Sequence, residues 1–242
     1  MNIALIFAGG SGTRMNTKSR PKQFLEMNGK PIIIHTIEYF ENCKDIDKIV
    51  VVCIEDWIER FGKMLTKYNI TKVERVVPGG ATGQLSIYNG LCAAREVAGD
   101  KLSESVVLIH DGVRPLITEQ LILDNIAMVK EKGSAITVTP ATETIIQVNE
   151  NNEISNVVDR NSCYTAKAPQ SFFLKDILAV HEKALSEGKD NMIDSATMMR
   201  TYGHVLHTVV GPVENIKITN PTDFYIFRSI YEARENSQIF GL

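Results

Sequence analysis

Ala8-Gly9-Gly10-Ser11-Gly12-Thr13-Arg14-Met15 and the following Pro21-Lys22-Gln23-Phe24 are the most informative segments of this chain. They come after the apolar run at 3–7, which is typical of a buried strand. A Gly-rich turn at the end of such a strand exposes backbone N–H groups with no Cβ atoms in the way, so polyphosphate oxygens can approach closely. Arg14 and Lys22 are spaced so that both can fold back over the same phosphates. The two segments therefore predict a site that holds and polarises a triphosphate.

Two other phosphate-binding loops do not match this spacing. The dinucleotide-binding pattern G-x-G-x-x-G fails at its third glycine, where Met15 stands, and the Lys-Ser or Lys-Thr pair of a Walker A loop does not follow. An ordinary strand-to-loop turn, whose glycines only provide a positive φ, remains the alternative. The two cations placed directly after the turn favour the phosphate-binding interpretation.

Length and composition limit the classes of protein to which the chain can belong. Its 242 residues, 44% of them apolar, fit a single domain spanning 1–242 better than two small ones. A net charge of −3 argues against a nucleic-acid partner. The four cysteines form no C-x-x-C pair, and we expect free thiols, three of them buried, in a reducing cytosol. Without a signal-peptide pattern or a transmembrane-length apolar run, the sequence predicts a cytoplasmic protein with no membrane partner.

Strand-like and helix-like segments alternate along most of the chain, which predicts an α/β fold with βαβ units around a mainly parallel sheet. Continuous apolar runs such as 49–54 are typical of strands covered on both faces. Predicted strands cover 3–7, 49–54, 73–77, 106–109, 135–138, 205–210 and 215–218, and predicted helices cover 33–42, 55–68, 83–98, 118–132, 175–187, 194–202 and 221–234.

One region differs in character from these βαβ units. The β-prone segments 143–148 and 154–158 flank the polar turn Asn149-Glu150-Asn151-Asn152. This pattern predicts a hairpin arm, within about 139–165, that projects from the main sheet and serves dimerisation. A hairpin that only covers an edge of the sheet is the alternative.

Three groups of glycines and charged residues fall at the ends of predicted strands. They are the loop at 8–22, the segment 79–86 and His110-Asp111-Gly112-Val113-Arg114. In open α/β sheets ligands bind at the carboxyl ends of the strands, so we expect these groups to meet. Asp111 offers carboxylate oxygen to Mg²⁺ or to a ribose hydroxyl. Arg114 is either a ligand-binding cation or the ion-pair partner of Asp111.

Seven motifs occur in order along nearly the whole chain. They are A-G-G-S-G-T-R-M at 8–15, P-K-Q-F at 21–24, G-K-P-I-I-I-H-T at 29–36, H-D-G-V-R-P at 110–115, V-D-R-N at 158–161, A-P-Q-S-F at 168–172 and N-I-K-I-T-N-P at 215–221. With these motifs the sequence resembles the cytidylyltransferase family that joins CTP to a polyol phosphate. Branches of that family act on ribitol 5-phosphate or on 2-C-methyl-D-erythritol 4-phosphate. The resemblance implies a Rossmann-like three-layer nucleotidyltransferase fold with a protruding β-hairpin arm.

The resemblance also implies roles for individual residues. Those assigned to catalysis around the phosphates are Arg14, Lys22 and Lys217. Those assigned to the nucleotide are Ala8, Gly9, Gly10, Gly12, Gly79, Gly80, Ser86 and Asp111, of which Asp111 is also the candidate ligand of Mg²⁺. Those assigned to the polyol phosphate are Arg114, Thr144 and Arg160, the last two reaching across from the arm of a partner subunit in a homodimer.

Departures from the family pattern bear on the acceptor. Ala168 and Ile193 stand where methylerythritol-phosphate enzymes carry threonines, and Phe7-Ala8-Gly9-Gly10 is closer to the ribitol branch. We therefore expect ribitol 5-phosphate as the acceptor, with methylerythritol 4-phosphate as the alternative. Ala81 and Gly83 replace residues that often follow the glycine pair, which makes selectivity for cytosine a weaker expectation than nucleotidyl transfer.

Other classes of protein remain open at this stage. Sugar-1-phosphate nucleotidyltransferases also open with G-G-x-G-T-R, and they are distinguished by their use of UTP, dTTP or GTP. A non-catalytic nucleotide-binding subunit would bind nucleotide without releasing pyrophosphate. A zinc site at His204 and His207 has little support, because no cysteine lies nearby in the sequence.

Overall fold

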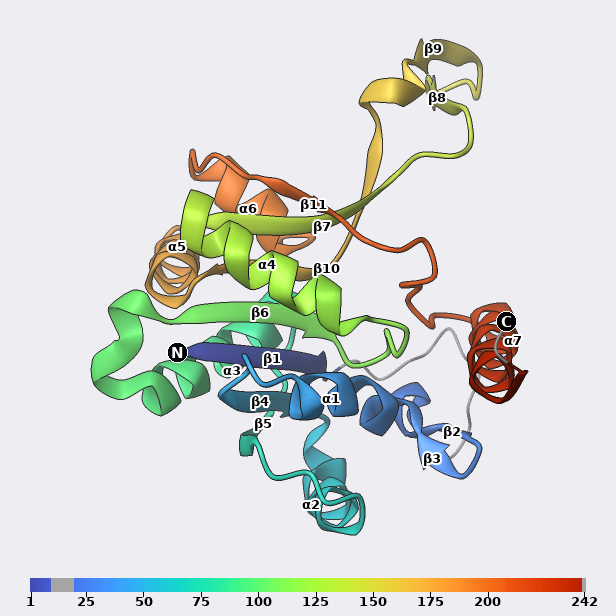
Figure 1. The fold of residues 1–242 in the computed structure, drawn as a ribbon. Coiled ribbons are helices and arrows are strands. Elements are labelled where there is room, and N and C mark those ends of the chain that lie inside the picture. The colour runs from blue at the N-terminus through green and yellow to red at the C-terminus, as the bar shows by residue number, and fades with distance from the viewer. Residues whose placement is uncertain (10–19, 241–242) are drawn as a thin grey trace.

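The computed structural model describes residues 1–9 and 20–240 (Figure 1). Its strands are β1 (Asn2–Ala8), β2 (Glu26–Met27), β3 (Lys30–Pro31), β4 (Lys48–Cys53), β5 (Val73–Pro78), β6 (Val106–Asp111), β7 (Ser134–Pro140), β8 (Ile145–Val148), β9 (Ile154–Val158), β10 (Tyr164–Phe173) and β11 (Thr208–Val210). Its α-helices are α1 (Ile32–Asn42), α2 (Ile58–Lys67), α3 (Gly83–Ala98), α4 (Glu119–Lys132), α5 (Leu174–Ser186), α6 (Ser195–Thr201) and α7 (Pro221–Phe240).

The central sheet has the strand order β11-β7-β10-β6-β1-β4-β5. Strand β10 pairs antiparallel with β6 and β7, and the other neighbours in this sheet pair in parallel. Ala8 at the end of β1 pairs with Cys53 of β4, and Phe7 pairs with Asp111 of β6. The parallel strands therefore end level with one another, at one edge of the sheet.

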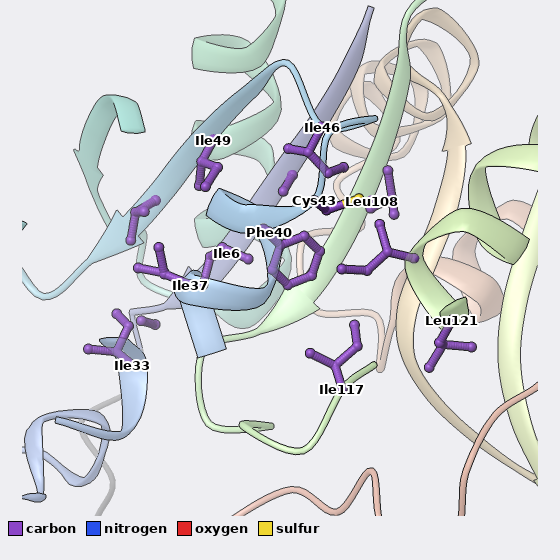
Figure 2. Close-up of a cluster of buried hydrophobic side chains, with 14 of the residues drawn as sticks. Ile6, Ile33, Ile37, Phe40, Cys43, Ile46, Ile49, Leu108, Ile117 and Leu121 are labelled. Atoms are coloured by element: carbon purple, nitrogen blue, oxygen red, sulfur yellow. The ribbon is translucent and has the colours of Figure 1, made fainter. Parts of the chain in front are cut away.

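Helices cover both faces of this sheet, because side chains alternate along the strands and each buried strand has two apolar faces. Ile6 of β1 lies in a hydrophobic cluster with residues of α1, α2 and α4. Leu5, its neighbour, lies in a second cluster with residues of α3, α5 and α6. Figure 2 shows Phe40 of α1 among the aliphatic side chains of the first cluster. The α/β fold with three layers and a mainly parallel sheet is confirmed.

The ends of the helices follow from local chemistry. Thr82 and Thr118 each accept a hydrogen bond from a backbone N–H in the first turn of α3 and α4, and Asp194 does the same for α6. Gly133 ends α4 with a φ of 88°, a left-handed conformation that glycine adopts without strain. Gly90 brings α3 close to the sheet, since a Cβ atom there would collide with Leu5 of β1.

The hairpin arm is formed by β8 and β9, which pair antiparallel as a separate two-stranded sheet. In Figure 1 it projects beyond the ends of β7 and β10, well clear of the main sheet. The predicted hairpin is confirmed as a projecting arm. That the whole chain forms a single domain stays a prediction.

The short strands β2 and β3 were not expected, and β11 covers only part of the predicted strand 205–210. Two larger differences concern β10 and the segment 215–218. Strand β10 was not expected, because it contains Pro169 and polar residues and takes its partners from strands distant in the sequence. The segment 215–218 forms no strand, because its backbone bonds to the loop after β6, with Ile218 N–H donating to Val113 O at 2.9 Å.

The cysteines differ slightly from expectation. All four are free thiols, but Cys43 and Cys53 are buried whereas Cys92 and Cys163 are only partly buried. Within 1–9 and 20–240, every helix is too short or too polar to span a membrane.

Candidate active site

The candidate active site lies at the edge where β1, β5 and β6 end. Gly9 follows β1, Gly79 follows β5 and Asp111 is the last residue of β6. This edge is where a doubly covered sheet leaves space between its loops for a ligand. Three groups that are far apart in the sequence are therefore brought together as expected. Gly10, Gly12 and Arg14 lie outside the described residues.

The glycines of this edge pack against one another. A Cβ atom on Gly9 would lie 3.5 Å from the Cα of Gly79, and one on Gly79 would lie 3.2 Å from Ser86 Oγ. Gly80 N–H donates to Ser86 Oγ at 2.9 Å, and Ser86 Oγ donates to Thr82 O at 2.8 Å. Ser86 is buried, so in this structure its hydroxyl holds the glycine turn in place.

Lys22 is held next to the end of β1 by its neighbours. It opens the short 3₁₀ helix η2 (Lys22–Phe24). The buried Gln23 donates from Nε2 to Ala8 O at 2.6 Å. Phe24 is fully buried and stacks on Trp57 with ring centroids 4.4 Å apart. These contacts fix the backbone that carries Lys22 beside the end of β1.

Asp111 forms the electrostatic centre of the site. Its Oδ2 lies 2.7 Å from Arg114 Nε, and its Oδ1 lies 2.6 Å from Lys217 Nζ. Burial by itself would raise the pKa of Asp111, but the charges and hydrogen bonds of Lys217 and Arg114 outweigh it and hold that pKa well below its usual range. Asp111 is therefore a carboxylate that orients two cations at the mouth of the site.

Lys217 reaches Asp111 because the chain after β11 docks against the loop after β6. Arg114 Nη1 donates to Asn215 O at 2.9 Å, and Asn215 Nδ2 donates to Ala168 O at 2.7 Å. Ile218 is fully buried beside Val113 in the hydrophobic cluster that carries α7. Arg114 thus serves both as the ion-pair partner of Asp111 and as the anchor of the Lys217 segment.

His110 precedes Asp111 but is not placed to act as a base. It is buried, and its Nε2 donates to Arg114 O at 3.2 Å. Burial lowers its pKa to about 4, so the ring is neutral at physiological pH. Its contact supports the turn between Asp111 and Arg114.

A cavity of about 200 Å³ opens beside this ion-pair cluster. Ala168 and Ile193, the two positions that depart from the methylerythritol pattern, both line it. Lys167 lines it as well and donates from Nζ to Val213 O at 3.1 Å. His181 of α5 also lines this cavity.

Thr144 and Arg160 lie at the base of the arm rather than in this cavity. Both are exposed, and they flank the paired ends of β8 and β9, where Ile145 pairs with Val158. Arg160 Nη1 donates to Thr142 O at 3.2 Å. The structure of the single chain therefore brings Thr144 and Arg160 near each other but not to Asp111.

Metal-binding groups are sparse in the part of the chain that the structure describes. It contains no cluster of three or more His, Cys, Asp or Glu side chains that could hold a metal ion. His207 instead contacts Ser134 Oγ through Nδ1 at 3.3 Å. Mg²⁺ needs only one or two carboxylates when substrate phosphates supply its other ligands, so Asp111 alone fits that mode of binding.

Comparison with known proteins gives the family. The family IspD, 2-C-methyl-D-erythritol 4-phosphate cytidylyltransferase, matches residues 2–232. The chain belongs to this cytidylyltransferase family. It is 56% identical over 242 residues to a ribitol-5-phosphate cytidylyltransferase of Streptococcus agalactiae serotype III, and 53% identical over 241 residues to one of Vibrio parahaemolyticus, with 100% of each chain covered. The crystal structure of 4-diphosphocytidyl-2C-methyl-D-erythritolsynthase from Anaerococcus prevotii matches with a TM-score of 0.80 and 28% identity, covering 96% of each chain.

The resemblance seen in the motifs is thus confirmed, and the protein is a nucleotidyltransferase that uses CTP and a polyol phosphate. Sequence reasoning did not assign several residues of this cytidylyltransferase's site. Gln23 and Asn215 stood within quoted motifs, yet only the structure shows that they hold Lys22 and Lys217 in place. No role was assigned to Lys167 or His181, because only the packing of β10 and α5 brings these two residues to the cavity.

Proposed function

We propose that this cytidylyltransferase transfers CMP from CTP to ribitol 5-phosphate, forming CDP-ribitol and releasing pyrophosphate. The observation that carries the proposal is that Ala168 and Ile193 line the same cavity as Asp111 and Lys217. Each of these two positions lacks the hydroxyl expected in the methylerythritol branch, so an acceptor that relied on those hydroxyls would leave polar groups unpaired. The identity of 53–56% to proteins named ribitol-5-phosphate cytidylyltransferase supports the same acceptor.

The reaction needs positioning and charge neutralisation more than a strong base. An oxygen of the acceptor phosphate attacks the α-phosphorus of CTP, a new P–O bond forms, and the bond to the β-phosphate breaks as pyrophosphate leaves. The attacking oxygen is already anionic, so no side chain has to remove a proton from it. We assign Arg14, Lys22 and Lys217 to the charge that accumulates on the α-phosphorus and the leaving group.

The nucleotide and the metal are assigned to the glycine edge. We assign the phosphates and ribose of CTP to the loop at 8–12 and to Asp111, and the base to the turn of Gly79, Gly80 and Ser86. Mg²⁺, held by phosphate oxygens together with Asp111, would supply further neutralisation of the transferring group. Lys217 Nζ and Arg114 Nε contact one oxygen of Asp111 each, so the ion would share the carboxylate with these two cations.

We further propose a homodimer formed through the arm. Ile146, Val148, Ile154 and Val157 are 46–63% exposed, and Ile146 pairs with Val157 while Val148 pairs with Ile154 across the hairpin. An apolar face of this kind on a two-stranded hairpin needs a partner to cover it. In such a dimer Thr144 and Arg160 bind the acceptor phosphate of the neighbouring subunit, together with that subunit's Arg114. The four free thiols support an enzyme that works in the cytoplasm.

The proposed function is tested by tracing the α-phosphorus of CTP into the product. CTP labelled at that position is incubated with Mg²⁺ and ribitol 5-phosphate, and the products are separated. We expect the label in CDP-ribitol, in amounts equal to the pyrophosphate released. Label that stays in CTP, or that appears as free CMP, would contradict the proposal.

The dimer has its own test, since Val157→Asp places a charge on the apolar face of the arm. Sedimentation should show a dimer for the unaltered protein and a monomer for Val157→Asp, whereas the control Asn156→Asp, the adjacent polar position, should remain a dimer. A monomeric unaltered protein would contradict the proposed interface.

A further inference from the structure

The cavity is lined by a histidine that the proposed reaction does not use. His181 of α5 is 1% exposed, whereas Ile193 at the rim of the same cavity is 92% exposed. The imidazole stacks on Tyr88 of α3, with centroids 5.9 Å apart and planes inclined by 18°. Neither Nδ1 nor Nε2 has a hydrogen-bond partner among the described residues. A buried polar side chain with two unused nitrogens is costly unless something else binds them.

Two glutamines that line the same cavity are already engaged. Gln84 donates to Lys189 O at 2.7 Å and accepts from Met192 N–H at 2.8 Å. Gln170 donates to Asp194 Oδ2 at 2.8 Å and accepts from Ala196 N–H at 2.9 Å. Both amides thereby hold the segment 189–196, part of which lines the cavity. His181 differs from these glutamines because both of its buried ring nitrogens lack a partner in the described part of the chain.

The ionisation state of His181 indicates what it can bind. Burial lowers its pKa to about 4, so at neutral pH the ring carries one N–H donor and one nitrogen acceptor. A hydroxyl group has the same combination of donor and acceptor, whereas a phosphate oxygen offers only acceptors. Phosphate is matched instead by Arg114 and Lys217, which line the same cavity. The cavity therefore combines cations that suit a phosphate with a neutral imidazole that suits a hydroxyl.

We propose that His181 is a specificity-determining residue that hydrogen-bonds the terminal hydroxyl of the polyol acceptor, the one farthest from its phosphate. The inference rests on the proposed function, because it takes a polyol phosphate as the molecule in the cavity. The volume of about 200 Å³ has room for several water molecules or for a short polyol chain in their place.

The test compares two acceptors in three proteins. The acceptors are ribitol 5-phosphate and 1-deoxyribitol 5-phosphate, which lacks only the terminal hydroxyl. The proteins are the unaltered enzyme, His181→Leu, which keeps the volume without hydrogen-bonding groups, and His181→Gln, which keeps a donor and an acceptor. We expect the unaltered enzyme to prefer ribitol 5-phosphate by roughly tenfold or more in kcat/KM, because a site that hydrogen-bonds a hydroxyl rejects the analogue without it.

His181→Leu should reduce that preference to below about threefold, with KM for CTP changed less than about twofold, and His181→Gln should restore part of it. A preference that survives in His181→Leu would overturn the inference while leaving the proposed function intact. Equal losses with both acceptors would also overturn it, since they would indicate a purely structural histidine. An unaltered enzyme that is inactive with ribitol 5-phosphate would overturn the proposed function and the inference together.

A second measurement uses only the unaltered enzyme, so it does not depend on the folding of a variant. The imidazole ¹⁵N signals of His181 should move when ribitol 5-phosphate is added to the unaltered enzyme, and should move less with the 1-deoxy analogue. Identical shifts with the two acceptors would overturn the inference.

Discussion

Replacing Asp111 by Asn tests the ion-pair cluster that positions the cations of the site. The side chains of Asp111 and Arg114 are only 14% and 11% exposed, and breaking a buried ion pair of this kind costs about 3–5 kcal/mol. Lys217 is 37% exposed, so screening by water limits its share to about 1 kcal/mol or less. Asn keeps the size of Asp and one acceptor for Arg114, so we expect a net loss of about 3 kcal/mol in the free energy of unfolding.

For a chain of this length that loss lowers the melting temperature by about 6–12 °C at neutral pH, which scanning fluorimetry without ligands can measure. The control is Glu232→Gln on α7, whose ion pair with Arg228 is solvent-exposed, so its melting temperature should change by less than about 2 °C. Equal shifts in melting temperature for Asp111→Asn and Glu232→Gln would show that the ion pairs of Asp111 are no more stabilising than a solvent-exposed ion pair.

The same variant has a defined pH dependence. Lys217 and Arg114 hold the pKa of Asp111 below its ordinary value of 3.8, so folding stabilises the ionised carboxylate. That contribution is complete above pH 3.8 and is lost as the pH falls from there toward the folded-state pKa. The difference between the unaltered protein and Asp111→Asn should therefore be constant above pH 5 or so and become smaller near pH 3. A difference that stays constant down to about pH 3 would show that the charge of Asp111 is not responsible.

Three further predictions concern catalysis and packing. Lys22→Ala or Lys217→Ala should lower kcat by about 100-fold or more with a smaller change in KM for CTP, and near-normal turnover in pyrophosphate-release assays would contradict their assignment to the transition state. Arg160→Ala should raise KM for the acceptor by roughly tenfold or more with little change for CTP, whereas equal weakening of both would contradict a phosphate site that includes the partner's arm. Gly90→Ala, whose added Cβ meets Leu5 and Val52, should destabilise by about 1–3 kcal/mol, whereas Gly62→Ala on the exposed part of α2 should stabilise by about 0.5–1 kcal/mol in urea unfolding. Similar effects of the two glycine changes would refute the close approach of α3 to the sheet.

The elements that the sequence predicted well are those defined by local signals. Helix α3 occupies the residues expected for it, and the structure shows local signals at both ends, since Thr82 caps its start and Gly99 follows its end with a φ of 51°. The arm was expected because a polar turn separates two β-prone segments, and Asn152 in that turn has a φ of 60°. The proximity of Gly9 to the end of β6 was expected, because parallel strands have their carboxyl ends at the same edge of a sheet.

The elements that the sequence did not predict depend on contacts between distant segments. Strand β10 exists because β6 and β7 leave a space between them, which a polar, proline-containing segment fills by antiparallel pairing. Lys217 was expected on a strand, but its backbone follows the loop after β6 and so brings the ammonium group to Asp111. His181 occupies an ordinary buried position on an amphipathic helix, and only the packing of α3 and α5 shows that its nitrogens have no partner.

The most direct test of the account is the ratio of kcat/KM for ribitol 5-phosphate to that for 2-C-methyl-D-erythritol 4-phosphate, measured with CTP and Mg²⁺. The account predicts a ratio of roughly 100 or more in favour of ribitol 5-phosphate, because Ala168 and Ile193 replace the two hydroxyls that the other acceptor would require. A ratio near one, or in favour of methylerythritol 4-phosphate, would show that these two positions do not select the acceptor.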